Sequence, residues 1–473
     1  MIDDLPDDDL LTIFDFYVAG YENQRAIEAL VFTNDQDRKR EIESWQSLVH
    51  VCRRWRALVF GSPRRLKLQL WCTTITPARE TMDVWPTLPV LIRGDISETS
   101  VDNVIAVLEH SDRIYQIEFN FQTTLQIEKI WTAMQAPFPE LRSLYLSFRG
   151  VSYEPALPDS FLVGSAPRLE FLSLVAVPFR GILSSVTHLR ELHLIFIPHS
   201  EYISPEAMVA CLTMLTYLNS FGLEFKSPQS CPDQENRRFP PPTRSVLPYL
   251  GLFLFKGANE YLEELVARID TPQLSWLSTT FFNDIDFDIP ELIQFISRIP
   301  KFGAFDRARL IFDYCDALVR LQSPLDSRKV EVCVLCEVLD WQVSSLAQIC
   351  TLSLHFFSTM ETLYIHEDLH SRLNLKDDIE DAEWLDLLLP FKAVKNLYLS
   401  KQFSPHIARV LQELTGGRTT EVLPVLQNIL LEGFQPSEPV HEGIGQFISA
   451  RQLSNLPVRI SEWERDPEQE LNY

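Results

Sequence analysis

The stretch Leu141-Arg-Ser-Leu144-Tyr-Leu146 contains the pattern that decides the fold of this chain. Its apolar residues stand at the first, fourth and sixth positions. The alternation at the end of the stretch is typical of a β-strand with one buried face, because successive side chains of a strand point to opposite sides. The leucine three positions earlier is expected to cap the layer below. The stretch therefore predicts a short strand that is buried on one side only.

The same pattern recurs after residue 100. Its middle residues at positions 117, 144, 172, 192 and 221 are 27, 28, 20 and 29 residues apart. Helical periodicity lies between the copies, as at Ser100–Ser111, Pro205–Leu218 and Pro290–Ile299. One strand and one helix cannot bury their own apolar face, so neighbouring units must stack. The spacing predicts an α/β fold, an irregular leucine-rich solenoid with parallel strands on its concave face and helices outside. The copies begin at Ile114, Leu141, Leu169, Leu189, Leu218, Leu250, Met360, Val394 and Leu426.

The repeats become irregular in the second half of the chain. Within residues 301–345 the sequence predicts two strands, placed only loosely at Ala308–Phe312 and Val330–Leu335. Ser227–Thr243 is polar and rich in proline, which predicts an exposed loop. Asp368–Asp386 is acidic and is predicted to be a second insertion.

The composition is that of a folded protein of more than one domain. The chain has 473 residues, of which 46% are hydrophobic and 23% charged, and its formal net charge is −23. Such an acidic chain repels phosphate backbones and anionic lipid, so neither nucleic acid nor a membrane is an expected partner. The eight cysteines have no repeated spacing, and no signal peptide or long apolar span is evident. We therefore expect free thiols and an intracellular location, cytoplasmic or nuclear.

Two helical signals precede the repeats. In Leu5–Phe14 a proline and three aspartates favour a helix start, because free N–H groups and the positive end of the helix dipole attract carboxylates. Trp45–Val59 carries the apolar stripe of an amphipathic helix. The charged residues 20–44 between them predict a solvated loop or an irregular helix. From Val51 to Leu70 there are six basic residues and no acidic one. Any single arginine here is expected first on a solvated helix face, and as a functional group the six favour an acidic protein partner over nucleic acid.

These two signals resemble the two halves of an F-box, the short helical module that docks a protein onto a ubiquitin-ligase scaffold. The run from Val51 through Pro89 is similar to a large group of fungal F-box proteins, whose F-box leads into a leucine-rich-repeat-like body. It reads Val-Cys-Arg-Arg-Trp-Arg, then Phe-Gly-Ser-Pro-Arg-Arg-Leu, Thr-Pro-Ala-Arg and Asp-Val-Trp-Pro-Thr-Leu-Pro. The chain departs from the family at Asp9, where Val or Ile is usual, and in the length of residues 20–44.

With the repeats, the resemblance implies an F-box at 1–70 with its charged insertion at 20–44, a connecting segment at 71–100, the solenoid at 101–460 and a polar tail at 461–473. It implies a substrate-receptor subunit of an SCF-type cullin-RING E3 ubiquitin ligase. The implied partners are the adaptor subunit, cullin through that adaptor, and an unknown target protein. The residues expected to hold the adaptor by apolar burial are Leu5, Pro6, Leu10, Leu11, Ile13, Phe14, Val49, Cys52 and Trp55.

No catalytic, cofactor-binding or metal site is predicted, and the chain is not expected to be an enzyme. Cys333-Val-Leu-Cys336 has zinc-type spacing without a second pair, so two thiols buried in a strand are the preferred interpretation. His366-Glu367-Asp368 follows a repeat strand and is interpreted as a solvated turn. The sequence also lacks the common phosphate-binding and nucleophile motifs. Two alternatives stay open: a repeat scaffold whose helical head only caps the solenoid, and an enzyme with unfamiliar motifs.

Overall fold

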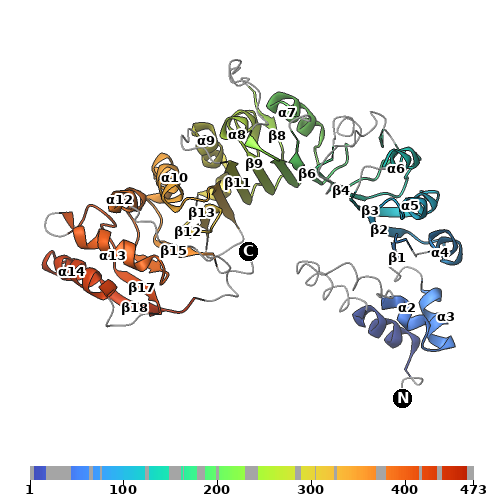
Figure 1. The fold of residues 1–473 in the computed structure, drawn as a ribbon, viewed down its shortest axis with the longest axis horizontal. Coiled ribbons are helices and arrows are strands. Elements are labelled where there is room, and N and C mark those ends of the chain that lie inside the picture. The colour runs from blue at the N-terminus through green and yellow to red at the C-terminus, as the bar shows by residue number, and fades with distance from the viewer. Residues whose placement is uncertain are drawn as a thin grey trace. The chain divides into compact units, whose positions relative to one another are not determined.

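The chain forms two compact units, Met1–Val186 and Thr187–Tyr473. Figure 1 shows their elements in the computed structural model. The structure describes residues 5–17, 44–62, 68–74, 77–122, 127–148, 161–162, 165–177, 187–198, 202–228, 243–282, 289–303, 305–323, 328–368, 380–414, 418–433 and 439–465.

The first unit begins with helices and continues with alternating strands and helices. Residues 7–17 are helical, and α2 (Ser44–Val49) and α3 (Arg53–Gly61) follow. Strands β1 to β5 then pair in parallel and in chain order, with the intervening helices on one face of the sheet (Figure 1). These elements are β1 (Leu68–Trp71), α4 (Ala78–Val84), β2 (Val90–Ile96), α5 (Val101–Leu108), β3 (Ile114–Phe121), α6 (Ile127–Ala133), β4 (Ser143–Phe148) and β5 (Phe171–Val175).

A row of buried apolar residues crosses the strands of this unit. Leu70, Ile92, Ile117, Leu144 and Leu172 are register partners on successive strands. None of the five side chains is more than 4% exposed. The last three are middle residues of the predicted pattern, so the predicted strands are confirmed here. The row begins before residue 100. Strand β1 ends at the start of residues 71–100, which we expected to be only a connecting segment, and β2 lies within them.

The second unit continues the alternation. Its main sheet has the order β6-β7-β9-β11-β14-β13-β12-β15-β16-β17-β18. The strands are β6 (Glu191–Ile197), β7 (Ser220–Phe225), β9 (Leu252–Gly257), β11 (Trp276–Phe282), β12 (Arg307–Phe312), β13 (Asp316–Gln322), β14 (Lys329–Leu335), β15 (Thr362–Glu367), β16 (Asn396–Leu399), β17 (Asn428–Glu432) and β18 (Arg459–Trp463). The short strands β8 (Ser245–Val246) and β10 (Ile269–Asp270) form a separate parallel pair.

Helices cover one face of this sheet as well (Figure 1). Three helices that the sequence predicted are confirmed, namely α5 in the first unit and α7 and α9 in the second. The helical elements of the second unit are α7 (Pro205–Met214), α8 (Asn259–Val266), α9 (Pro290–Arg298), the 3-10 turn η7 (Pro300–Phe302), α10 (Leu339–Leu352), α11 (Leu354–Phe357), α12 (Asp381–Leu388), α13 (Ser404–Glu413) and α14 (Pro439–Leu453).

The expectation that all strands are parallel is wrong in the middle of the second unit. Strand β13 pairs antiparallel with both β12 and β14, while β14 is parallel to β11 and β12 is parallel to β15. Three residues separate β12 from β13 and six separate β13 from β14, and connections this short can join only antiparallel neighbours. The sequence predicted β12 and β14 but missed β13. Its buried Ala317, Val319 and Leu321 alternate along the strand, which is the signal that could have found it.

The two predicted insertions have different outcomes. Residues 229–242 of the proline-rich stretch lie outside the described residues. The acidic stretch Asp368–Asp386 is not wholly an insertion, because α12 begins at Asp381 and belongs to the helix layer. Trp384 of α12 is fully buried and its ring lies 5.9 Å from that of Phe312. The charges of this stretch concealed the apolar face of a repeat helix.

Within the described residues, none of the helices combines the length and the apolar character that crossing a membrane requires.

One carboxyl group in the helix layer should make stability depend on pH. Burial and a hydrogen bond with Asp340 raise the pKa of Glu383 from 4.5 to about 7. The folded chain therefore holds this proton more tightly than the unfolded chain. The resulting stabilisation is full below pH 4.5 and is lost as the pH rises through about 7. We expect the thermal unfolding temperature of the second unit to decrease when the pH is raised from 5 to 8. The decrease should be smaller in Glu383→Gln.

The control for this prediction is Glu413→Gln, which changes an exposed carboxylate on α13. It should keep the pH dependence of the unmodified chain. An unchanged pH dependence in Glu383→Gln would contradict the assignment of this proton.

Candidate functional site

The helices that precede β1 form a small core, which we call the helical head (residues 5–17 and 44–62). Leu10, Leu11 and Phe14 of the first helix are buried, as are Val49 of α2 and Val59 of α3. The ring of Phe14 also packs on that of Trp55, with 4.7 Å between the ring centroids. Such an aromatic contact contributes about 0.5–1.5 kcal/mol beyond the burial of its area. The apolar stripes predicted for the two signals therefore pack together.

Polar contacts fix how the first helix meets α3. The guanidinium of Arg54 donates a hydrogen bond to the backbone carbonyl of Leu5 and lies 2.7 Å from the carboxylate of Asp7. Cys52 caps α3, because its sulfur accepts from the backbone N–H of Trp55 at 3.4 Å. Arg56 donates to the carbonyl of Val49 at 3.0 Å. Two arginines that the sequence assigned to an acidic partner thus hold the head together.

The predicted adaptor-binding residues fall into three groups. Leu10, Leu11, Phe14 and Val49 are buried in the core of the head. Half-buried positions are those of Leu5, Cys52 and Trp55, and exposed positions are those of Pro6 and Ile13. The structure thus brings all nine into one helical module. Large apolar side chains outside the predicted set are exposed on the same module, namely Phe16 at 75%, Val51 at 58%, Tyr17 at 45% and Phe60 at 40%.

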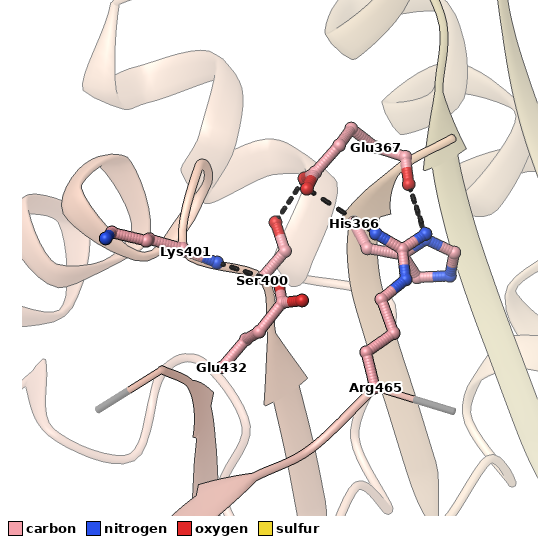
Figure 2. Close-up of polar contacts among 6 residues, drawn as sticks. All are labelled: His366, Glu367, Ser400, Lys401, Glu432 and Arg465. Atoms are coloured by element: carbon pink, nitrogen blue, oxygen red, sulfur yellow. Dashed lines mark hydrogen bonds and ion pairs between the residues drawn. The ribbon is translucent and has the colours of Figure 1, made fainter. Parts of the chain in front are cut away.

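A second candidate, a polar cluster, lies where β15, β16 and β18 end (Figure 2). The guanidinium of Arg465 contacts Nδ1 of His366 at 2.8 Å and an oxygen of the Glu367 carboxylate at 3.4 Å. The hydroxyl of Ser400 donates to the other oxygen of that carboxylate at 2.5 Å. Arg465 follows β18, yet it reaches across to β15. The start of the predicted polar tail is therefore tied to the sheet.

His366 is buried rather than solvated. Its side chain is 2% exposed, and burial lowers its pKa to about 3, with the charge of Arg465 acting in the same direction. The imidazole is therefore neutral near pH 7. This finding corrects our interpretation of His366-Glu367-Asp368 as a solvated turn. His366 belongs to β15. Because side chains alternate along a strand, it lies on the same side of β15 as Tyr364.

Neither this cluster nor the described cysteines form a recognisable catalytic arrangement. Ser400 donates to a carboxylate and not to the imidazole, so the cluster pairs no hydroxyl nucleophile with a histidine base. Cys336 is buried and Cys333 is half-buried, and every described cysteine is a free thiol. Burial raises the pKa of both thiols. Both groups therefore remain protonated near pH 7, as expected for thiols that fill space.

One group of possible metal ligands exists among the described residues. Asp313, Cys315 and Asp316 lie in or beside the turn between β12 and β13, with one ligand atom of each within 4.8 Å of the others. Burial and the two carboxylates raise the pKa of the Cys315 thiol. The thiol lies 3.6 Å from the carboxylate of Asp316, to which it donates. A hydrogen-bonded turn explains this group fully.

Comparisons with known proteins do not assign this chain to a family. No known family model matches the chain, and no curated protein matches its sequence. Among solved structures, the chain is similar to the leucine-rich repeat-containing protein LegL7 from Legionella pneumophila. The two share 14% sequence identity with a TM-score of 0.30, over 81% of this chain and 97% of that one. The α/β repeat fold of this chain rests on its strand pairing and register.

The head offers a direct test of which phenylalanine holds it together. Phe14→Ala should destabilise the head by about 3–5 kcal/mol, because it removes a buried ring that packs on Trp55. Phe16→Ala should change its stability by less than about 0.5 kcal/mol, because Phe16 is 75% exposed. Hydrogen exchange of the α3 amides reports local opening of the head without requiring the whole chain to unfold. The exchange rate in α3 should rise by at least about 100-fold in Phe14→Ala and should not rise in this way in Phe16→Ala.

Equal exchange in both variants would contradict the packing of the first helix on α3. Exchange in β15 and β16 serves as the internal control, because these strands lie in the second unit and should not respond.

Proposed function

We propose that this chain is the substrate-receptor subunit of an SCF-type cullin-RING ubiquitin ligase. The helical head would bind the adaptor subunit, and the repeat sheet would bind a target protein. The resemblance to fungal F-box proteins supports this proposal. The observation that carries it is the apolar surface of the head. Ile13 and Phe16 on the first helix and Val51 before α3 are all about half exposed or more, whereas Leu10, Leu11 and Phe14 are buried.

Large apolar side chains that stay exposed on a small module are typical of a binding surface. Burial of Ile13 or Phe16 against a partner would contribute about 1.5–3 kcal/mol each. Binding energy at protein interfaces is concentrated in a few such side chains. The buried residues Leu10, Leu11 and Phe14 would then position the exposed ones, and would not contact the adaptor themselves.

In this proposal the chain performs no bond chemistry. It would hold a target protein close to the ubiquitin-charged enzyme and increase the rate of transfer by proximity.

One observation favours the alternative, a repeat scaffold that does not associate with a ligase. Four of the nine residues expected to hold the adaptor are buried inside the head. A head that only caps the repeats would be built in the same way, because its apolar residues would serve its own core.

Co-purification with the adaptor separates these two functions. The full chain should retain the adaptor, and Phe16→Ser should weaken binding by about 30-fold, because a buried phenylalanine contributes about 2 kcal/mol. Ile13→Ser should act in the same direction. The control is Val84→Ser, since Val84 is 82% exposed on α4, outside the head. A full chain that does not retain the adaptor, or equal retention by Phe16→Ser and Val84→Ser, rejects the ligase proposal.

A further inference from the structure

Three large apolar side chains are exposed where β12 ends and α10 begins. Tyr314 lies in the turn between β12 and β13 and is 66% exposed. Val338 and Trp341 lie at the start of α10 and are 41% and 44% exposed. Large apolar side chains that gather at the surface of a folded unit are typical of a binding surface. We call Tyr314, Val338 and Trp341 the aromatic patch.

Hydrogen bonds hold the two segments of the aromatic patch next to each other. The backbone N–H of Cys336 donates to the carbonyl of Cys315 at 2.9 Å. The side-chain amide of Gln342 donates to the carbonyls of Asp313 and Cys336 at 2.8 and 2.6 Å. Gln342 is itself buried. The turn and the start of α10 are therefore joined by backbone positions that flank the exposed side chains.

Carboxylates surround the aromatic patch. Asp313 and Asp316 lie in or beside the turn that carries Tyr314, and Glu337 is exposed shortly before α10. Burial and the charge of Asp313 raise the pKa of Asp316, and Lys256 of β9 opposes this with a smaller effect. Within the described ranges, no lysine or arginine forms an ion pair with any of these three carboxylates. The patch is therefore bordered by negative charge that the described cations do not neutralise.

We propose that the aromatic patch and its bordering carboxylates form a docking surface for a basic segment of the target protein, in which lysine or arginine stands beside an apolar residue. The charge of such a segment is complementary to Asp313, Asp316 and Glu337. Aromatic rings also attract lysine and arginine over their faces. The identity of the binder as a target rests on the proposed function, whereas the surface itself does not depend on adaptor binding.

The exposed rings should give this surface its selectivity. The whole chain is acidic, with a formal net charge of −23, so charge alone would attract a basic segment to many places. Binding energy at interfaces is concentrated in a few large side chains, and aromatic residues are prominent among them. We therefore expect Tyr314 and Trp341 to contribute most of the affinity, and Glu337 to contribute to the salt dependence.

The test is direct binding by the full chain in the absence of the adaptor. The probe is a fluorescein-labelled peptide, Lys-Arg-Leu-Lys-Arg-Leu-Lys, and the reference peptide has Gln in place of every Lys and Arg. We expect the basic peptide to bind at least about tenfold more tightly than the reference. Its affinity should fall with added salt, because salt screens exposed charges.

Variants with matched controls place the binding on this surface. Tyr314→Ser should weaken binding of the basic peptide at least about tenfold, because it removes a ring that the peptide would cover. The control is Tyr249→Ser, since Tyr249 is 60% exposed before β9 in the same unit. It should change the affinity less than about twofold. Glu337→Lys should weaken binding more than Glu413→Lys, which reverses an exposed charge on α13.

Equal affinity for the two peptides would overturn the proposal, and so would equal losses in Tyr314→Ser and Tyr249→Ser. Thermal unfolding of each variant is measured alongside binding and should be unchanged, because the substituted side chains are exposed. Should Tyr314→Ser fail to fold, the comparison of Glu337→Lys with Glu413→Lys decides. Failure of adaptor binding would leave these results unchanged, so the two proposals fail separately.

A second arm identifies the source of the basic segment. The sequence after Asp368 contains Arg372 and Lys376, which the same surface could bind within the chain. The variant with Arg372→Gln and Lys376→Gln should bind the basic peptide as tightly as the unmodified chain. Peptide binding that is seen only in this variant would reject the assignment of the surface to a target protein.

Discussion

The rest of the structure depends on one row of contacts. In this row an apolar residue at the middle of each strand packs against its register partner on the next strand. In the second unit, Leu192, Phe221, Phe253, Leu277 and Val330 form such a row through parallel register. A shift of one residue in any strand would turn its buried set outward, so the register is strongly specified. The helices then have one face to cover, and the other face stays available for polar and aromatic side chains.

Much of this arrangement could be predicted from the sequence. The leucine pattern gave the strands of the regular repeats, because apolar alternation is a local property of the chain. Strand β13 was missed because its pattern, Ala317-Leu-Val319-Arg-Leu321, lacks the preceding leucine that marks the other repeats. The antiparallel pairing also depends on which connections hold a helix, which the pattern alone does not show. Trp384 was missed because the acidic residues around it suggested a solvated insertion.

The candidate sites were less predictable than the fold. Phe14 packs on Trp55, so the two helical signals meet in one module, but the sequence did not separate buried Phe14 from exposed Phe16. That distinction depends on which face meets α3. The polar cluster brings together His366, Ser400 and Arg465 from the ends of three strands. No spacing along the chain reveals it. Arg54 belongs to the basic stretch for which the sequence favoured an acidic partner, and the structure instead uses it to hold Leu5 and Asp7.

The proposed division of roles is that the helical head binds the adaptor and the repeat sheet binds a target protein. Hydrogen–deuterium exchange of the full chain, with and without the adaptor, tests this division most directly. The account predicts that the adaptor slows exchange in residues 5–17 and in α3 and leaves β12 to β16 unchanged. Unchanged exchange in the head, or protection found only in the second unit, would contradict it.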